Sequence, residues 1–242
     1  MAARALNPAR HAGKRDEFVE AGQRLIQTKG YEHFSVEDLL SEVGASKGAF
    51  YHYFDSKQAL LEAVIERLVD SGMAVVQAVV DDESLTAVDK LRRYFSGIAN
   101  FKTERVDFLL ALMRVWYSDD NAIVREKFRR QLVRRVTPHM AAIIRQGVAA
   151  GDFTLTEPDQ MGRVVLSLIL DAADEAGELW FAAVDGRVDL ATIRKRFAAY
   201  STALQRLLGV PPGAFELIDD EVLRFWFAEV IPTADNPRRE NQ

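Results

Sequence analysis

Apolar residues recur at intervals of three and four positions along most of the chain, which is the period of an amphipathic α-helix. In the first such stretch, which starts at residue 16, Phe18, Ala21, Leu25 and Ile26 fall on one stripe, and Gly30 is placed to end the helix in a left-handed conformation. The strict alternation typical of half-buried strands is hard to find over more than a few residues. The pattern therefore predicts an all-α protein.

Two short helices are predicted next. Ser35, three residues before Asp38, is expected to cap a helix that runs to about Val43 and ends at Gly44. Ser46 is then expected to cap a second short helix that ends near residue 54. Two helices thus meet across a turn that contains glycine, which is typical of a helix-turn-helix, whose second helix enters the major groove of DNA.

Longer amphipathic patterns follow. Ser56 is expected to cap the next helix, and Thr137-Pro138 predicts either a kink or a new helix start within a later one. Further long helices are expected to open at Thr156 and at Asp189. The predicted long helices cover about residues 57–81, 85–98, 106–116, 121–150, 157–183 and 189–208, and a short last helix follows.

Composition excludes several kinds of protein. The 242 residues are 48% apolar and 28% charged, close to the averages of globular proteins, so a sizeable core is expected. The absence of cysteine excludes disulfides, thiolate zinc sites and cysteine nucleophiles. The longest nearly uninterrupted apolar stretch, Val164 to Leu170, is far shorter than the roughly 20 residues that cross a bilayer. With no apolar signal run in residues 1–15, we expect a cytoplasmic protein without a membrane partner.

The net charge of −5 argues against a basic surface over the whole chain, and so against DNA binding. Its distribution changes this interpretation. Residues 1–15 hold four basic residues and no acidic one, and residues 1–60 hold eight of each sign, so the whole net charge comes from residues 61–242. A modest basic surface near the N-terminus, attached to an acidic remainder, is compatible with DNA binding and keeps nonspecific binding weak.

The second short helix carries side chains that suit a DNA contact. Its start offers a hydroxyl, an ammonium and a glycine that allows close backbone approach, and its later positions offer aromatic rings for phosphates and thymine methyl groups. The four consecutive aromatic positions 51–54 cannot all face one core, so some point outward. Lys57, in the first turn of the next helix, is a further candidate phosphate contact. The candidates within the short helix are Ser46, Lys47, Gly48, Tyr51, His52 and Tyr53.

Residues 34–40 (FSVEDLL) and 44–60 (GASKGAFYHYFDSKQAL) closely resemble the DNA-binding domain of the TetR (tetracycline repressor) family. The resemblance covers about residues 14–65, and the rest of the chain is similar to the family only as a helical domain. It implies a homodimeric transcriptional regulator, usually a repressor, that binds a palindromic operator and is released by a small effector. The implied domains are a basic flexible arm (1–15), a three-helix DNA-binding head (16–62), a helical effector-binding and dimerisation body (63–232) and a polar tail (233–242).

The resemblance also implies roles for single residues. The third helix becomes the recognition helix, which adds Ala49 to its DNA-facing residues, and Ser35 and Lys57 are placed on phosphates. Phe50 and Phe54 match core positions that hold this helix against the first. The helices over about 157–183 and 189–208 are implied to form the dimer interface, with the effector bound between head and bundle.

Candidate effector-lining residues lie at helical spacing in the predicted body. For the apolar ones, packing in the core is the simpler interpretation. For the acidic ones, a solvated or partner-facing helix face is the alternative. No histidine follows a glutamate by three residues, so a di-iron bundle is not predicted, and neither is any other metal or cofactor. The candidates are Phe95, Phe101, Met113, Arg114, Trp116, Tyr117, Asp171 and Glu175.

Residues 44–48 also satisfy the G-x-S-x-G pattern of a hydrolase nucleophile elbow, with Ser46 as the nucleophile. That site needs a buried strand before the serine, whereas the residues before Ser46 have a helical period. The chain is therefore predicted not to be an enzyme. The alternatives are a hydrolase that uses Ser46, or a helical enzyme or small-molecule carrier that keeps the head as a structural remnant.

Overall fold

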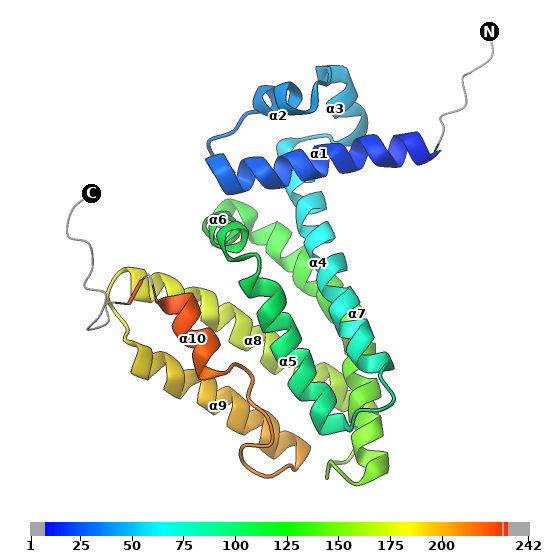
Figure 1. Cartoon of the computed structure of the whole chain (residues 1–242), viewed down its shortest axis with the longest axis vertical. Helices are drawn as coiled ribbons and strands as arrows, with labels where there is room; N and C mark the ends of the chain where they lie inside the picture. The colour runs from blue at the N-terminus through cyan, green and yellow to red at the C-terminus, as the bar shows by residue number, and fades with distance from the viewer. Residues whose placement is uncertain (1–7, 229, 232–242) are drawn as a thin grey trace. The chain divides into compact units, whose positions relative to one another are not determined.

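The computed structural model describes residues 8–228 and 230–231, without the side chains of residues 8–12 and 119. Its secondary structure over these residues is helical, with no strand (Figure 1), which confirms the predicted all-α class. The chain packs as two units. The head unit comprises Met1–Ser71 and Arg105–Arg129, and the body unit comprises Gly72–Glu104 and Arg130–Gln242.

The head unit contains α1 (Pro8–Lys29), α2 (Val36–Val43), α3 (Lys47–Tyr53), the start of α4 (Lys57–Asp81), α6 (Val106–Trp116), a short 3-10 helix (Asp119–Asn121) and the start of α7 (Ala122–Ala150). Helix α6 packs against α1. Phe108, Leu112 and Val115 of α6 share one buried core with Phe18 and Phe50. The unit is therefore larger than the expected head over residues 16–62, because distant apolar residues complete its core.

Helix α1 begins at Pro8, eight residues before the predicted start. Proline suits the first position of a helix because its φ is already helical and its missing N–H has no intrahelical partner there. Ala, Arg and Lys then dominate the next seven residues and favour helix. Residues 8–15, expected as part of a flexible arm, thus belong to α1, while residues 1–7 and the expected tail 233–242 lie outside the described residues.

The short helices begin and end where the sequence predicts, because local side chains satisfy their backbone groups. Ser35 and Asp38 form a reciprocal capping box at the start of α2. Ser46 and Ser56 each accept a hydrogen bond from the backbone N–H three residues later, at the starts of α3 and α4. Gly44 ends α2 at φ 62°, a left-handed conformation that costs glycine little.

The body unit contains the end of α4, α5 (Ala87–Thr103), the end of α7, α8 (Pro158–Val184), α9 (Leu190–Leu208) and α10 (Asp220–Phe227). Helices α8 and α9 pack against each other, and α10 contacts α9 and α5. Helix α7 continues through Pro138, so no new helix begins there. Helix α8 starts at Pro158 instead of Thr156, because Glu157 adopts a left-handed conformation and Pro158 takes the first helical position.

No helix in the described parts of the chain combines the length and the apolar character that a membrane span requires.

Candidate nucleic-acid interface

Helix α3 is held in place by its buried face. Phe50 is fully buried, and its ring lies edge-on to that of Phe18 in α1, with 5.7 Å between centroids. Phe54, which caps the helix, is also buried and lies 6.3 Å from Phe18. Such aromatic pairs add about 0.5–1.5 kcal/mol beyond the area they bury. The core positions expected for Phe50 and Phe54 are confirmed, and they fix which face of α3 is turned outward.

The outward face of α3 carries Lys47, Gly48, Tyr51 and His52, all of them exposed. Tyr51 keeps 48% of its surface exposed, which is unusual for a large aromatic residue in a short helix with a buried neighbour. A Cβ at Gly48 would have the Ser46 hydroxyl oxygen, 4.0 Å away, as its nearest neighbour. The backbone of α3 is therefore open to a close approach at this position.

The remaining predicted residues of α3 are less exposed. Ala49 is half-buried and packs against the head core. Tyr53 is also half-buried, with its ring 6.0 Å from that of Phe18. Ser46 is exposed, and its hydroxyl accepts the N–H of Ala49, so its first role is to cap the helix. The predicted set thus divides into an outward group and a group that supports the helix.

Glu37 was missed at the sequence level. Its carboxylate lies 3.6 Å from the ammonium of Lys47, and both side chains are well exposed. The pair joins the first turn of α2 to the first turn of α3. Its position next to the capping Asp38 places Glu37 in the first turn of α2. The sequence does not indicate that Lys47 of α3 lies beside it. An exposed pair of this kind is worth at most about 1 kcal/mol, so an approaching phosphate can compete for Lys47.

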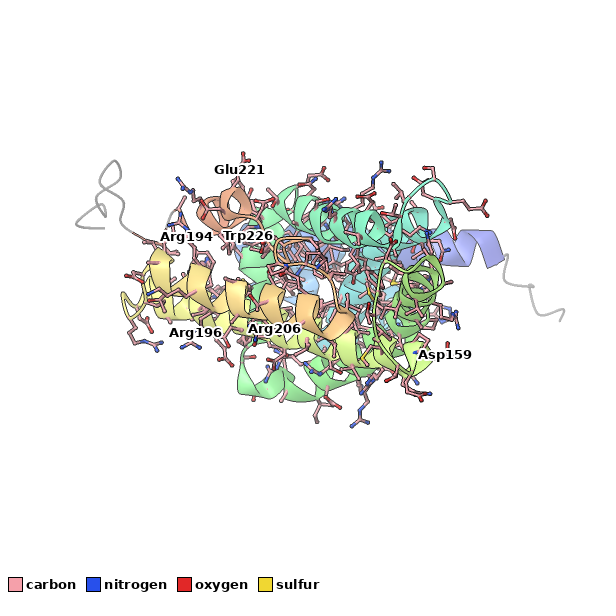
Figure 2. All side chains as sticks on the ribbon, turned by 90° about the horizontal axis from the view of Figure 1, so that it is seen from below. Asp159, Arg194, Arg196, Arg206, Glu221 and Trp226 are labelled. Atoms are coloured by element: carbon pink, nitrogen blue, oxygen red, sulfur yellow. The ribbon has the colours of Figure 1, made fainter. Side chains whose placement is uncertain are left out.

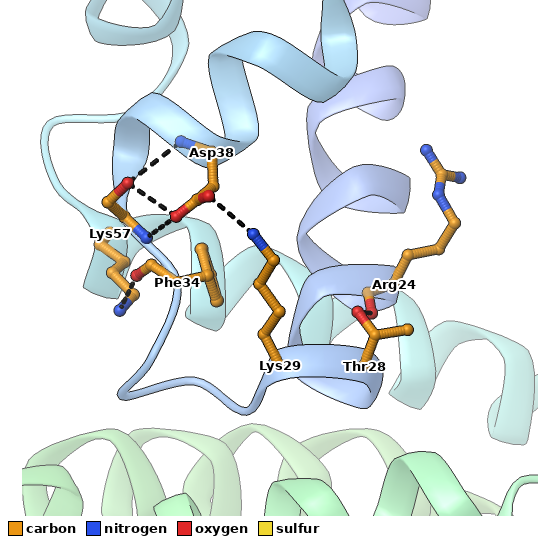
Figure 3. A network of polar contacts seen from close by, with 7 residues as sticks. Arg24, Thr28, Lys29, Phe34, Asp38 and Lys57 are labelled. Atoms are coloured by element: carbon orange, nitrogen blue, oxygen red, sulfur yellow. Dashed lines mark hydrogen bonds and ion pairs between the residues drawn. The ribbon is translucent and has the colours of Figure 1, made fainter.

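The start of α2 is an ordered polar network (Figure 3). The Ser35 hydroxyl accepts the N–H of Asp38 at 3.1 Å and donates to the Asp38 carboxylate at 2.8 Å. The ammonium of Lys29 donates to the same carboxylate at 2.7 Å. These hydrogen bonds, that from Lys29 foremost, hold the pKa of Asp38 well below its usual range. Since the single hydroxyl proton of Ser35 is already donated to Asp38, the phosphate contact expected of this hydroxyl has no free donor.

Lys57 differs most from its predicted role. Its ammonium donates to the carbonyl oxygen of Tyr31 and, at 2.7 Å, to that of Phe34. It also lies 4.4 and 4.3 Å from the ring centroids of these two residues. Burial lowers the pKa of Lys57. The ammonium expected to contact phosphate is directed into the turn between α1 and α2.

Two basic residues of α1 lie beside the same core. The guanidinium of Arg15 is stacked over the ring of Phe54, 5.4 Å from its centroid. Lys14 forms an ion pair with Glu17 at 2.6 Å. Both belong to the segment expected as a flexible arm, and the helix gives them fixed positions next to the residue that caps α3.

The predicted effector residues do not all belong to one unit. The head unit holds Met113, Arg114, Trp116 and Tyr117, and the body unit holds Phe95, Phe101, Asp171 and Glu175. Trp116 packs against the head core and lies edge-on to Phe128 at 4.8 Å. Phe95 is buried in the body, 5.6 Å from the ring of Phe215. For Trp116 and Phe95 the simpler interpretation, packing in a core, is therefore the one observed.

The two acidic candidates are bound to α9. The hydroxyl of Tyr200 donates to Asp171 at 2.6 Å, and the guanidinium of Arg196 donates to Glu175 at 2.5 Å. The hydrogen bond to Asp171 raises the pKa of Tyr200 to about 12. Figure 2 shows Arg194 and Arg196 on opposite sides of α9, and Arg194 pairs with Asp220 of α10 at 3.2 Å. The acidic residues thus link α8 to α9 through these hydrogen bonds.

The body unit has a hollow beside α5 with a volume of about 170 Å³. Its lining comes from α5 and from the segment before α10, and of the predicted effector residues Phe95 alone contributes. Pockets for drug-sized ligands have volumes of about 300–1,000 Å³. The hollow is thus smaller than an effector site of that kind. The lining residues are Arg92, Phe95, Ser96, Ala99, Glu216, Leu217, Ile218 and Asp219.

The interface geometry coincides with a known family. Residues 18–64 match the family model described as "Bacterial regulatory proteins, tetR family". The match begins at Phe18 in α1 and extends into α4, so it covers α2, the turn and all of α3. Residues 18–64 therefore form a domain of the TetR family. The residues on the outward face of α3 lie in the matched part of the chain.

Parts of the chain are similar to known regulators and to a solved structure. The chain is 26% identical over 130 residues to the HTH-type transcriptional repressor DhaR of Mycobacterium sp. (strain GP1), covering 54% of the chain and 65% of the relative. It is 30% identical to the HTH-type transcriptional regulator YvdT of Bacillus subtilis (strain 168), covering 35% of the chain and 44% of that relative. The chain thus spans less than two thirds of the length of either. A TetR transcription regulator from Haloarcula marismortui has the same fold, with TM-score 0.54, 24% identity, and coverage of 79% of this chain and 98% of that one.

The hydrolase alternative fails on the surroundings of Ser46. A nucleophile elbow places its serine on a sharp turn that follows a strand, whereas Ser46 follows α2. Its hydroxyl is used as the cap of α3. The G-x-S-x-G pattern at residues 44–48 is therefore the turn of a helix-turn-helix.

Proposed function

We propose that this protein is a TetR-family transcriptional regulator that binds operator DNA through the outward face of α3. The observation that carries the proposal is the two-sided character of that helix. Phe50 anchors one side in the head core, while Lys47, Tyr51 and His52 stand exposed on the other. Exposed aromatic and basic side chains on a firmly anchored helix suit contacts with base edges and phosphates in a major groove.

The proposed contacts divide by chemistry. Lys47 supplies a cation for a phosphate and must release Glu37 to do so. Gly48 allows the helix backbone to approach the DNA closely, and the Tyr51 hydroxyl and the His52 ring supply groups for hydrogen bonds and for packing on thymine methyl groups. Ser46, Ala49 and Tyr53 remain in the proposed interface as residues that set the position of these groups.

We propose a homodimer formed through α8 and α9, as the family resemblance implies. Two features of these helices support it. Val164, near the start of α8, is 44% exposed. On α9, Ala199 and Ala203 are exposed one helical turn apart, and small residues allow helices of two subunits to approach closely. A two-fold dimer presents two copies of α3 and so requires an operator with two-fold symmetry, with half-sites about one helical turn apart or a multiple of it.

We also propose a regulatory role for residues 63–232, the effector-binding and dimerisation domain that the family resemblance implies. A small molecule that binds it lowers operator affinity only if it binds the conformation that does not fit DNA more tightly than the one that does. The Mycobacterium relative is a transcriptional repressor, which supports repression as the outcome of DNA binding here. The test of regulation is to titrate a ligand of the body against operator affinity, and a body ligand without effect on affinity contradicts the switch.

DNA selection tests the proposed function. The purified full chain is incubated with a library of random duplexes, and the retained duplexes are amplified and sequenced over several rounds. The expected result is enrichment of a two-fold symmetric sequence that binds an even number of chains. If no sequence is enriched over the starting library, sequence-specific DNA binding is contradicted. Enrichment of an asymmetric site bound by a single chain contradicts the dimer and retains the DNA binding.

A further inference from the structure

The starting observation is a conflict between the position of Lys57 and the role that its sequence suggests. Its place in the first turn of α4 favours a phosphate contact, yet its ammonium is directed into the head. We infer that Lys57 is a positioning residue, which holds the turn between α1 and α2 against the start of α4 and so sets the entry of α2, without contacting DNA. This inference rests on the proposed DNA binding.

The contacts of Lys57 leave little of its ammonium for a partner. A lysine ammonium has three N–H donors and no acceptor. Two acceptors are the carbonyl oxygens of Tyr31 and Phe34, which lie three residues apart in the turn. The rings of the same two residues flank the ammonium, 4.4 and 4.3 Å from it, at distances typical of cation–π contacts. Each residue thus offers the ammonium both its carbonyl oxygen and its ring.

The turn held by Lys57 leads directly into α2. Phe34 is buried in the head core, and the next residue, Ser35, is the cap of α2. On the α1 side, Lys29 binds Asp38 of the same capping box at 2.7 Å. Figure 3 shows the two lysines at this one helix start, with Lys57 at the carbonyl of Phe34 and Lys29 at the carboxylate of Asp38. The start of α2 is therefore held by one ammonium from α1 and one from α4.

A phosphate contact would cost Lys57 these interactions. If the ammonium turned outward, the carbonyl oxygens of Tyr31 and Phe34 would lose their charged donor, and an unpaired polar group in a partly buried position is unfavourable. Lys47 provides the contrast, because it is more exposed and forms an ion pair with the exposed carboxylate of Glu37 at 3.6 Å. The two lysines of the motif thus have different roles, Lys47 toward the DNA and Lys57 toward the turn.

Salt dependence separates the two roles. Each phosphate contact that is lost makes the slope of log K against log salt concentration less steep by about 0.9. The matched variants are Lys57→Met and Lys47→Met, which keep the length of the side chain and remove its charge. Affinity is measured by fluorescence anisotropy between about 50 and 300 mM KCl, with the duplex enriched from the random library. Hydrogen exchange of the same variants reports the amides of residues 35–40 against those of α1.

We expect Lys47→Met to reduce the slope by about 0.9, as for one lost phosphate. We expect Lys57→Met to leave the slope unchanged and to weaken binding at least about fivefold, the lower end of ordinary coupling between sites. Exchange at residues 35–40 should become faster in Lys57→Met while α1 keeps its protection, which a general loss of stability would not produce. A slope reduced by about 0.9 in Lys57→Met, or unchanged exchange at residues 35–40, overturns the inference.

A measurement on the unmodified protein keeps the inference testable if Lys57→Met does not fold. NMR of the lysine ammonium groups should show a Lys57 signal that keeps its position when the enriched duplex is added, while that of Lys47 moves. A Lys57 signal that moves with the DNA overturns the inference. If the wild-type protein binds no duplex, the proposed function has failed, and exchange at residues 35–40 still decides whether Lys57 holds the turn.

Discussion

The head and body units use the same residue types for different purposes, and two glycines show the difference. A Cβ at Gly48 of α3 would lie 4.0 Å from its nearest neighbour, the hydroxyl oxygen of Ser46. A Cβ at Gly162 of α8 would lie 2.7 Å from the backbone nitrogen of Ala141 in α7. The glycine in the head leaves its helix open to an external partner, and the glycine in the body lets two helices of one chain pack closely. A glycine in a helix therefore does not by itself distinguish binding from packing.

The contacts that define the short helices of the head and those that link the helices of the body also differ in their spacing along the chain. In the head, α2, α3 and α4 each begin at a serine whose hydroxyl accepts the backbone N–H three residues later. The proposed DNA contacts all fall within residues 46–53. In the body, Tyr200 binds Asp171 and Arg92 binds the carbonyl of Ala214, so partners lie 29 and 122 residues apart. Local order makes the function of the head recognisable, while that of the body depends on contacts between distant segments.

The largest expected effect concerns the proposed dimer. Val164→Glu places a carboxylate at the same point on both subunits, and like charges facing each other cost several kcal/mol. The dissociation constant of the dimer should rise about 100-fold or more. Ile123→Glu is the matched control, because Ile123 is 70% exposed and belongs to the head unit. Sedimentation equilibrium decides, and a Val164→Glu dimer that stays intact while Ile123→Glu dissociates contradicts the assignment of the interface to α8.

Gly162→Ala should have the next largest effect. The added methyl group would overlap the backbone of α7 at Ala141, and overpacking of this kind costs about 1–3 kcal/mol. Gly13→Ala in α1 is the control, because a Cβ there meets nothing within 4 Å. Removing a glycine from a helix interior should raise stability by about 0.5–1 kcal/mol. Urea unfolding followed by circular dichroism measures both, and equal shifts in the two variants contradict the close packing of α7 on α8.

Gly48→Ala tests whether DNA approaches the backbone of α3 closely at this position. The fold has room for the methyl group, so stability should rise by about 0.5–1 kcal/mol, as for other helical glycines. If DNA approaches the backbone at this position, affinity for the enriched duplex should fall about tenfold, the effect of a clash of about 1.4 kcal/mol. Anisotropy and urea unfolding on the same preparation give both numbers. A variant that is more stable and binds as tightly as wild type shows that α3 is not approached at Gly48.

Much of the head could be predicted because its determinants are local. Ser35 and Ser46 start helices by accepting a backbone N–H three residues later, and Gly44 ends one through its own left-handed conformation. The periodicity around Phe50 indicates which face of α3 is buried. The direction of the Lys57 side chain could not be predicted, because the carbonyl oxygens it binds belong to residues 31 and 34, 26 and 23 positions away. Only the folded turn brings them to the start of α4.

The body was less predictable for the same reason. Helical spacing places Asp171 and Glu175 on one face of a helix. It does not show that each of them accepts a hydrogen bond from a side chain of α9. The division of the effector candidates between two units was equally hidden, because residues 105–129 join the head through the packing of α6 on α1. The early start of α1 at Pro8 was missed because an apolar stripe marks a helix only where it has a core to face.

The smallest expected effect is the pH dependence of the α2 capping box. The pKa of Asp38 is lowered in the folded head, chiefly by Lys29, so its contribution to stability is present above the unfolded value of about 4 and is lost as pH falls through the folded value. Asp38→Asn should therefore lose less stability than wild type between pH 5 and pH 2. Asp55→Asn, which removes an exposed carboxylate outside the capping box, is the control. Identical acid unfolding of Asp38→Asn and wild type contradicts the role of this carboxylate.

The central claim is that the outward face of α3 gives the protein its DNA sequence preference. The direct measurement is the ratio of affinities for the enriched duplex and for a scrambled duplex of equal length, in wild type, His52→Ala and the α1 surface variant Gln27→Ala, at one salt concentration. Since a base contact is worth about 1–3 kcal/mol, His52→Ala should lower the ratio by about tenfold while Gln27→Ala leaves it unchanged. A ratio that is the same in His52→Ala and in wild type would contradict the claim.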